Sequence, residues 1–78
     1  MEQLIRTIIE PLVDAPDQIQ INKDEREEKV VFKLSVDPDD MGKIIGKQGR
    51  VAKAIRTLVY SASRNEYDKK VYLDIIDS

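Results

Sequence analysis

Residues 42–50 read Gly42-Lys43-Ile44-Ile45-Gly46-Lys47-Gln48-Gly49-Arg50, in which a glycine pair flanks two polar residues. Helical patterns on both sides place this pair at a junction between two helices. Gly46 can end the first helix in a left-handed conformation without steric cost, and Gly49 leaves the backbone bare where the second helix begins. Free backbone amides at the start of that helix, together with the helix dipole, favour the binding of an anion. The stretch therefore predicts a phosphate site, to which Lys43, Lys47, Arg50 and Lys53 add positive charge.

The chain before this stretch begins with an amphipathic helix. Apolar residues recur at helical spacing over residues 4–13, and Pro16 follows as a stop. This pattern predicts a helix over residues 2–14. Pro11 lies inside it and cannot donate a hydrogen bond to the carbonyl of Thr7, so we expect a kink or a loosened turn there.

Two strands should follow, joined by a charged hairpin. Residues 19–21 alternate between apolar and polar, residues 23–29 are almost wholly charged, and residues 30–36 alternate again. The side chains that point away from the core would form a half-apolar, partly exposed sheet face: Val31, Lys33, Ser35, Tyr72, Asp74 and Ile76.

Two helices and a last strand complete the predicted order. Asp37-Pro38-Asp39-Asp40 supplies a capping carboxylate and a proline at the first helical position, so a short helix should begin there. The helix after the glycine pair should end near Asn65, a reasonable left-handed terminator. Its apolar residues are Val51, Ala52, Ile55, Leu58, Val59 and Ala62. Residues 71–75 alternate as a strand.

The resulting order of helix, strand, strand, helix, helix, strand predicts a single α+β domain over residues 1–78. Its three-stranded mixed sheet should carry the helices on one face. The first two strands should be antiparallel because a hairpin joins them, whereas the two-helix connection favours a right-handed crossover and a parallel second pair.

Composition narrows the possible functions. The chain has no Cys and no His, which removes disulfides, thiolate nucleophiles, most transition-metal sites and the usual general base. We therefore expect no enzyme, metal, cofactor or small-molecule substrate. No apolar run approaches the roughly 20 residues that cross a bilayer, and the N-terminus lacks a secretion pattern. We expect a protein of the cytoplasm that does not enter membranes.

Charge is distributed unevenly along the chain. The net charge is −2, yet residues 41–64 contain six cations and no carboxylate, so the remainder carries −8. Such a polarised domain offers one face to an anion and repels it elsewhere. A solvated helix face would explain the same distribution.

Two common nucleotide motifs do not fit the glycine stretch. A P-loop needs four residues between its first glycine and a Gly-Lys pair, followed by Ser or Thr, but here three residues intervene and Gln48 follows Lys47. The Gly-x-Gly of a dinucleotide fingerprint is absent, and a helix rather than a strand should precede the stretch.

Ile44-Ile45-Gly46-Lys47-Gln48-Gly49 between two helices resembles the core motif of the K-homology (KH) family, and the predicted element order is similar to its type II, bacterial form. The resemblance covers essentially the whole chain. It implies a cleft that clamps roughly four nucleotides of single-stranded RNA. Residues 46–49 would meet the sugar-phosphate backbone, and the candidates for apolar groove walls are Ile44, Ile45, Ala52 and Ile55. Because Tyr60, Tyr67 and Tyr72 lie outside the loop, base stacking should contribute little.

The resemblance also implies partners and a cellular role. Small bacterial proteins of this kind are associated with self-pairing, with a second, KhpB-like protein that also has a KH domain, and with post-transcriptional regulation or RNA chaperone activity in cell elongation, cell shape and cell wall biogenesis. The broad apolar pattern over residues 51–62 suggests the helix after the glycine pair as a dimer surface. Two alternatives remain: an interaction adaptor in which RNA binding is incidental, and an enzyme built on carboxylates or lysines.

Overall fold

The computed structural model describes residues 1–76 and has the predicted order of elements. Helix α1 (Glu2–Ile9) precedes strands β1 (Gln20–Glu25) and β2 (Lys29–Ser35). Helices α2 (Met41–Ile45) and α3 (Arg50–Ser63) follow, and strand β3 (Lys70–Ile75) comes last. Short 3-10 turns lie at Glu10–Leu12, Pro16–Gln18, Pro38–Asp40 and Lys47–Gly49.

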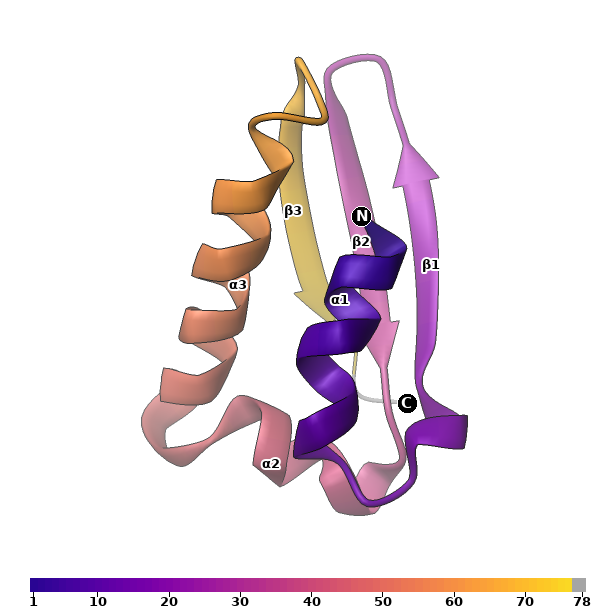
Figure 1. Cartoon of the computed structure of the whole chain (residues 1–78), viewed down its shortest axis with the longest axis vertical. Coiled ribbons are helices and arrows are strands. Elements are labelled where there is room, and N and C mark those ends of the chain that lie inside the picture. The colour runs from indigo at the N-terminus through magenta and orange to yellow at the C-terminus, as the bar shows by residue number, and fades with distance from the viewer. Residues whose placement is uncertain (77–78) are drawn as a thin grey trace.

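The three strands form one mixed sheet in the order β1-β2-β3. Strand β1 is antiparallel to β2, with Ile21 opposite Leu34, and β3 is parallel to β2, with Leu73 beside Phe32. Figure 1 shows α1 and α3 covering one face of the sheet, with α2 at the end opposite the β1-β2 hairpin. The predicted α+β fold, with helices on one face of a mixed sheet, is confirmed.

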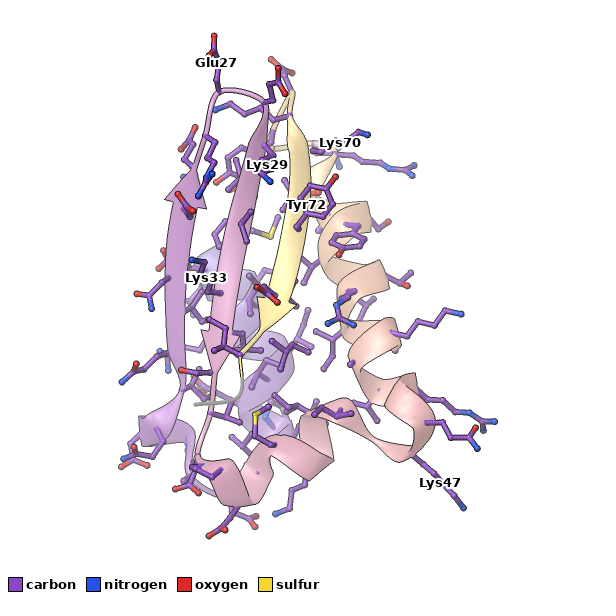
Figure 2. All side chains as sticks on the ribbon, turned by 180° about the vertical axis from the view of Figure 1, so that it is seen from behind. Glu27, Lys29, Lys33, Lys47, Lys70 and Tyr72 are labelled. Carbon is purple, nitrogen blue, oxygen red and sulfur yellow. The ribbon has the colours of Figure 1, made fainter. Side chains whose placement is uncertain are left out.

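The core lies between the central strand and the two longer helices. Alternate β2 residues Val30, Phe32 and Leu34 are at most 1% exposed. They pack in one cluster with Ile5 and Ile9 of α1 and with residues of α2, α3 and β3. On the open face Tyr72 is 42% exposed, and Val31, Lys33 and Ser35 are half-buried. The predicted exposure of this face is therefore confirmed (Figure 2).

One predicted helix end and one predicted helix terminator were wrong. The first α-helix ends at Ile9 rather than residue 14, because Pro11 lacks an amide hydrogen and the chain tightens into a 3-10 turn from Glu10. Helix α3 ends at Ser63, and Asn65 is not left-handed. The Ser63 carbonyl accepts the amides of Glu66 and Tyr67 at 3.0 and 2.9 Å, so the helix closes without a left-handed residue.

The start of the second helical region follows the prediction. The Asp37 carboxylate accepts the amide of Asp39 at 2.9 Å, and Pro38 occupies the first turn. No helix within residues 1–76 is both long enough and apolar enough to cross a membrane.

Candidate nucleic-acid interface

The loop between α2 and α3 has an unusual backbone. Gly46, Gln48 and Gly49 have φ angles of 74°, 57° and 74°. Gly46 has the expected positive φ, but its ψ of 179° lies outside the left-handed helical region. Gln48 and Gly49, with ψ of 26° and 14°, make the left-handed turn instead. No side chain of the described residues caps the start of α3, which leaves the end of that helix open to an external group.

Gly46 is required by packing as well as by φ. A Cβ atom placed there would lie 2.8 Å from Val51 Cβ and 3.0 Å from the Val51 backbone nitrogen. The loop backbone therefore packs directly on the first turn of α3. At Gly49 a Cβ would meet no atom of residues 1–76 within 4 Å, so the backbone faces open space there.

The four predicted cations of this region differ in their surroundings. Lys43 contacts the carboxylates of Asp14 and Asp40, the latter at 3.4 Å from Nζ. By contrast, Lys47, Arg50 and Lys53 are exposed and form no ion pair with any residue from 1 to 76. Lys47 projects away from the molecule at the loop (Figure 2). The uncompensated charge of the loop therefore comes from these three residues, whereas Lys43 is partly neutralised.

The four predicted apolar groove residues also differ in how exposed they are to solvent. Ile44, Ala52 and Ile55 are at most 4% exposed and belong to the protein interior. Ile45 is 40% exposed beside the loop. In this conformation only Ile45 of the four offers substantial apolar surface to a ligand.

Asp40 anchors the start of α2. Its carboxylate is buried and accepts the backbone amides of Asp14 and Ala15 at 3.1 to 3.2 Å. Burial acts to raise the pKa of this carboxyl, but the two amides and Lys43 outweigh it and hold the pKa below its ordinary value. The sequence indicated only a capping role for this cluster of carboxylates. No local signal distinguishes the anchoring carboxylate from its exposed neighbours.

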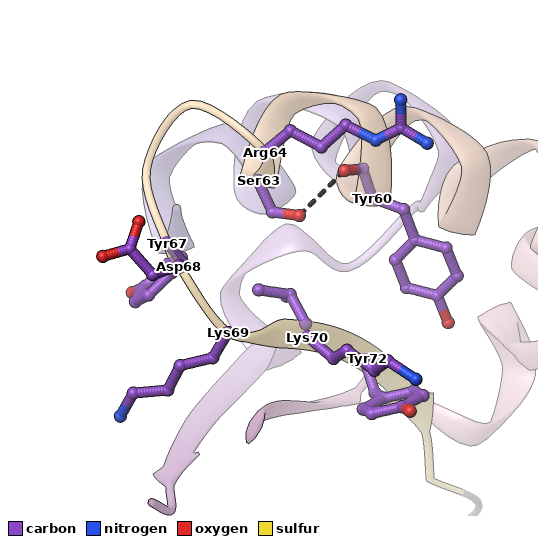
Figure 3. Close-up of a pocket in the computed structure, with 9 residues that line it drawn as sticks. Tyr60, Ser63, Arg64, Tyr67, Asp68, Lys69, Lys70 and Tyr72 are labelled. Atoms are coloured by element: carbon purple, nitrogen blue, oxygen red, sulfur yellow. Dashed lines mark hydrogen bonds between the residues drawn. The ribbon is translucent and has the colours of Figure 1, made fainter. Parts of the chain in front are cut away.

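A hollow of about 420 Å³ lies between the end of α3 and the edge strand β3. Figure 3 shows that Tyr60 of α3, Arg64 just after that helix, and Lys70 and Tyr72 of β3 surround it. The two tyrosine rings are edge to face, with centroids 6.5 Å apart. Sequence reasoning missed this pairing because the two residues lie on separate elements.

A second, apolar hollow of about 450 Å³ lies between α1 and α3. Leu4 and Ile8 line it from α1, and Leu58 and Ala62 from α3. Leu58 is 55% exposed, whereas Ile55 and Val59 of the predicted dimer surface are in the core. The apolar residues of α3 therefore lie on two different faces of the helix.

Comparison with known proteins shows the family of the chain. The family model described as "KhpA/KhpB, KH domain" matches residues 2–75. An RNA-binding protein KhpA from Oceanobacillus iheyensis is 58% identical over 76 residues, which cover 97% of this chain and all of that protein. The proteins of the same name from Listeria monocytogenes and Bacillus subtilis are 52% and 49% identical over 99% of this chain, covering 100% and 94% of their own lengths. With its type II order of elements, the chain belongs to the KhpA/KhpB family of KH-domain proteins.

Proposed function

We propose that this chain binds single-stranded RNA through the loop of residues 46–49 and catalyses no reaction. The observation that carries the proposal is the loop itself, whose glycine backbone is open at Gly49 and surrounded by cations that have no carboxylate partner within residues 1–76. The relatives named as RNA-binding proteins cover the whole loop region, which supports the same assignment.

In this proposal the residues divide their roles. Residues 46–49 approach the sugar-phosphate backbone, Lys47, Arg50 and Lys53 neutralise phosphates, and Ile45 offers apolar surface to a base. Ile44 and Lys43 support the loop from α2, one in the core and the other through Asp14 and Asp40. KH domains clamp about four nucleotides in this manner.

The test is fluorescence anisotropy of a labelled six-nucleotide RNA with wild type and with the Lys47→Asp, Gln48→Asp double variant. The fold should survive this change, because both side chains are exposed and Asp tolerates the left-handed conformation at position 48. We expect the double variant to lose at least about tenfold in affinity, since reversing a charge beside a phosphate repels it.

A matched control carries the same change in formal charge far from the loop. Arg26→Asp, Gln3→Asp alters two exposed residues, the first in the β1-β2 hairpin at the opposite end of the molecule from the loop (Figure 1). Equal affinity of wild type and the loop variant would reject the loop as the site. Equal losses in the loop variant and the control would show a general charge effect.

The apolar hollow supports a second part of the proposal, self-pairing. Leu4 and Leu58 are exposed at this hollow, and Ile8 and Ala62 line it half-buried, on a chain of 78 residues, a size at which association adds appreciably to stability. A second copy, packing α1 and α3 about a two-fold axis, would bury Leu58 on both sides. A KhpB-like protein with its own KH domain could use the same hollow in a heterodimer.

Light scattering tests this pairing. We expect Leu58→Asp to shift wild-type dimers to monomers, because a carboxylate cannot be buried there without a partner. Thr57→Asp, on the exposed surface outside the hollow, is the control and should remain dimeric. A Leu58→Asp protein that is still dimeric would reject this surface.

The cellular role rests on the family alone. We propose post-transcriptional regulation or RNA chaperone activity in the bacterial cytoplasm, with consequences for cell elongation, cell shape and cell wall biogenesis. The competing function is a protein-interaction adaptor that acts through the apolar hollow lined by Leu4, Ile8, Leu58 and Ala62. Complementation of a deletion strain separates them: the loop variant should fail if RNA binding matters, whereas only Leu58→Asp should fail if the chain is an adaptor.

A further inference from the structure

We infer that Asp14 is an internal competitor of RNA, which holds Lys43 away from the phosphates at the glycine loop and so limits the affinity of the chain. Asp14 lies in the connection between α1 and β1, more than thirty residues before the loop. The inference rests on the proposed function, because it assigns a regulating contact to the RNA site at residues 46–49.

Lys43 differs from the other cations near the loop because carboxylates of the described residues engage it. Its ammonium group contacts the carboxylate of Asp14 and lies 3.4 Å from Oδ1 of Asp40. The hydrogen bond to Asp14 is the main reason that the pKa of Lys43 is raised above its ordinary value; desolvation acts against this shift, and Asp40 adds a smaller contribution. Asp14 is therefore the principal partner of this lysine.

The contact between Asp14 and Lys43 contributes little to the stability of the fold. The side chain of Asp14 is 84% exposed and that of Lys43 is 45% exposed, and ion pairs between exposed charges stabilise proteins only weakly. The segment is anchored by its backbone instead, because the amides of Asp14 and Ala15 donate to the buried Asp40 carboxylate at 3.1 to 3.2 Å. These backbone bonds fix the position of residue 14, so its carboxylate stands beside Lys43.

Lys43 lies close enough to the loop for its charge to act on a bound phosphate. It precedes Gly46 by three residues, and the Gly46 amide donates to the Gly42 carbonyl at 2.9 Å, so the helical path continues to the loop. With a rise of 1.5 Å per residue, Lys43 and Gly46 are roughly 4–5 Å apart along the helix axis. This separation is shorter than the Debye length of about 8 Å at physiological salt, so the charge of Lys43 is felt at the loop.

Asp14 and an RNA phosphate are two anions that compete for the same ammonium group. A phosphate can pair with Lys43 only if it displaces Asp14, whose own exposed charge also repels it. In the wild type, the loop therefore presents three free cations, those of Lys47, Arg50 and Lys53. Removal of the Asp14 charge would make Lys43 available as a fourth.

The experiment is a double-mutant cycle, measured by fluorescence anisotropy of a labelled six-nucleotide oligouridine at several salt concentrations. It compares wild type with Asp14→Asn, with Lys43→Gln and with the combination of both. The backbone bonds from residues 14 and 15 to Asp40 do not involve the substituted side chains, so the fold should persist. The matched control is Asp39→Asn, which removes an exposed carboxylate just before α2 that forms no ion pair with any of residues 1–76.

We expect Asp14→Asn to bind the RNA about fivefold more tightly than wild type at about 0.1 M salt, and the magnitude of its salt slope to rise by about 0.7, because one phosphate contact is added. Lys43→Gln alone and the combined variant should both bind nearly as wild type does. Asp39→Asn should change the affinity by less than about twofold. A gain in affinity cannot arise from a variant that has lost its fold.

Four results would overturn the inference while wild type still binds RNA. Unchanged affinity of Asp14→Asn shows that Asp14 does not compete, and an equal gain in Asp39→Asn assigns the effect to net charge. The same gain in the combined variant shows that Asp14 does not act through Lys43. A loss in Lys43→Gln as large as that in Lys53→Gln shows that Lys43 already binds phosphate in the wild type. Failure of both wild type and Asp14→Asn to bind rejects the proposed function itself, which distinguishes the two failures.

Discussion

At the scale of single residues, the three glycines of the loop region have different reasons to be glycine. Gly46 has a positive φ and packs against Val51, whereas Gly49 has a positive φ but open space around it. Gly42 has neither constraint, because it lies within α2 and no atom of residues 1–76 would touch its Cβ. The three glycines look alike in a sequence motif, but each contributes differently to the stability of the fold.

Alanine substitutions should therefore produce a graded series of stabilities. We expect Gly42→Ala to raise the free energy of unfolding by roughly 0.5–1 kcal/mol through helix propensity. Gly49→Ala should lower it by about 1–2 kcal/mol because of the left-handed backbone. Gly46→Ala should lower it further, since strain and the contact with Val51 add. Urea denaturation measures the series, and a Gly46→Ala protein as stable as Gly49→Ala would contradict this packing role.

Gln48 provides the complementary case, a residue with a side chain in a left-handed conformation. Gln48→Gly should raise the free energy of unfolding by up to about 1 kcal/mol, because glycine adopts this backbone without strain. The same denaturation experiment measures it. Lys47→Gly, at a neighbouring position without a positive φ, is the control and should destabilise the protein.

At the scale of elements, α3 has three faces with different tasks. Ala52, Ile55 and Val59 face the core, and Leu58 faces the apolar hollow beside α1. Arg50 and Lys53 lie on the third face, which carries the charge. One helix therefore joins the glycine loop to the apolar hollow beside α1, which are the proposed RNA site and the proposed pairing surface.

The connection between α1 and α2 depends on Asp40, which binds the amides of residues 14 and 15 and contacts Lys43. Because the folded-state pKa of Asp40 is lowered, its contribution to stability is complete above its ordinary pKa of 3.8 and is lost as the pH falls through the lower folded value. We expect Asp40→Asn to lower the Tm at pH 7, and the difference from wild type to shrink below about pH 4.

Circular dichroism melts between pH 7 and about pH 2.5 measure this difference, since that range spans the titration of a carboxylate with a lowered pKa. Asp39→Asn is a suitable control, because Asp39 is an exposed neighbour whose side chain makes no long-range contact in the described chain. A Tm difference between wild type and Asp40→Asn that stays constant down to the lowest pH would show that the charge of Asp40 does not stabilise the connection between α1 and α2.

At the scale of the whole molecule, charge is segregated rather than balanced. The glycine loop and the charged hairpin lie at opposite ends of the molecule (Figure 1), with extents of 34 × 21 × 19 Å. Residues 41–64 contain six cations and no carboxylate, so the net charge of −2 hides a cationic stretch of the sequence, in which Lys43 is paired with Asp14 and Asp40. Such a distribution orients a polyanion while it limits nonspecific association.

Salt dependence measures this cationic stretch directly. With three phosphate contacts, from Lys47, Arg50 and Lys53, the slope of log K against log salt for a six-nucleotide RNA should be about −2. Lys53→Gln should reduce its magnitude by about 0.7. Arg26→Gln removes a cation that is paired with Asp24 at 3.1 Å and should leave the slope unchanged. A slope near zero for wild type would exclude binding through phosphate contacts.

The sequence by itself determined the order of elements, the helix start at Asp37-Pro38 and the position of the glycine loop, because these depend on neighbours in the chain. Local rules were less reliable at helix ends, where Asn65 proved unnecessary. Only the tertiary structure decided which isoleucine is buried, which carboxylate is an anchor, and that Tyr60 meets Tyr72. Those outcomes depend on the parallel pairing of β2 with β3 and on the packing of α1 and α3, which join segments far apart in sequence. No periodicity within one segment can specify the partner that covers it.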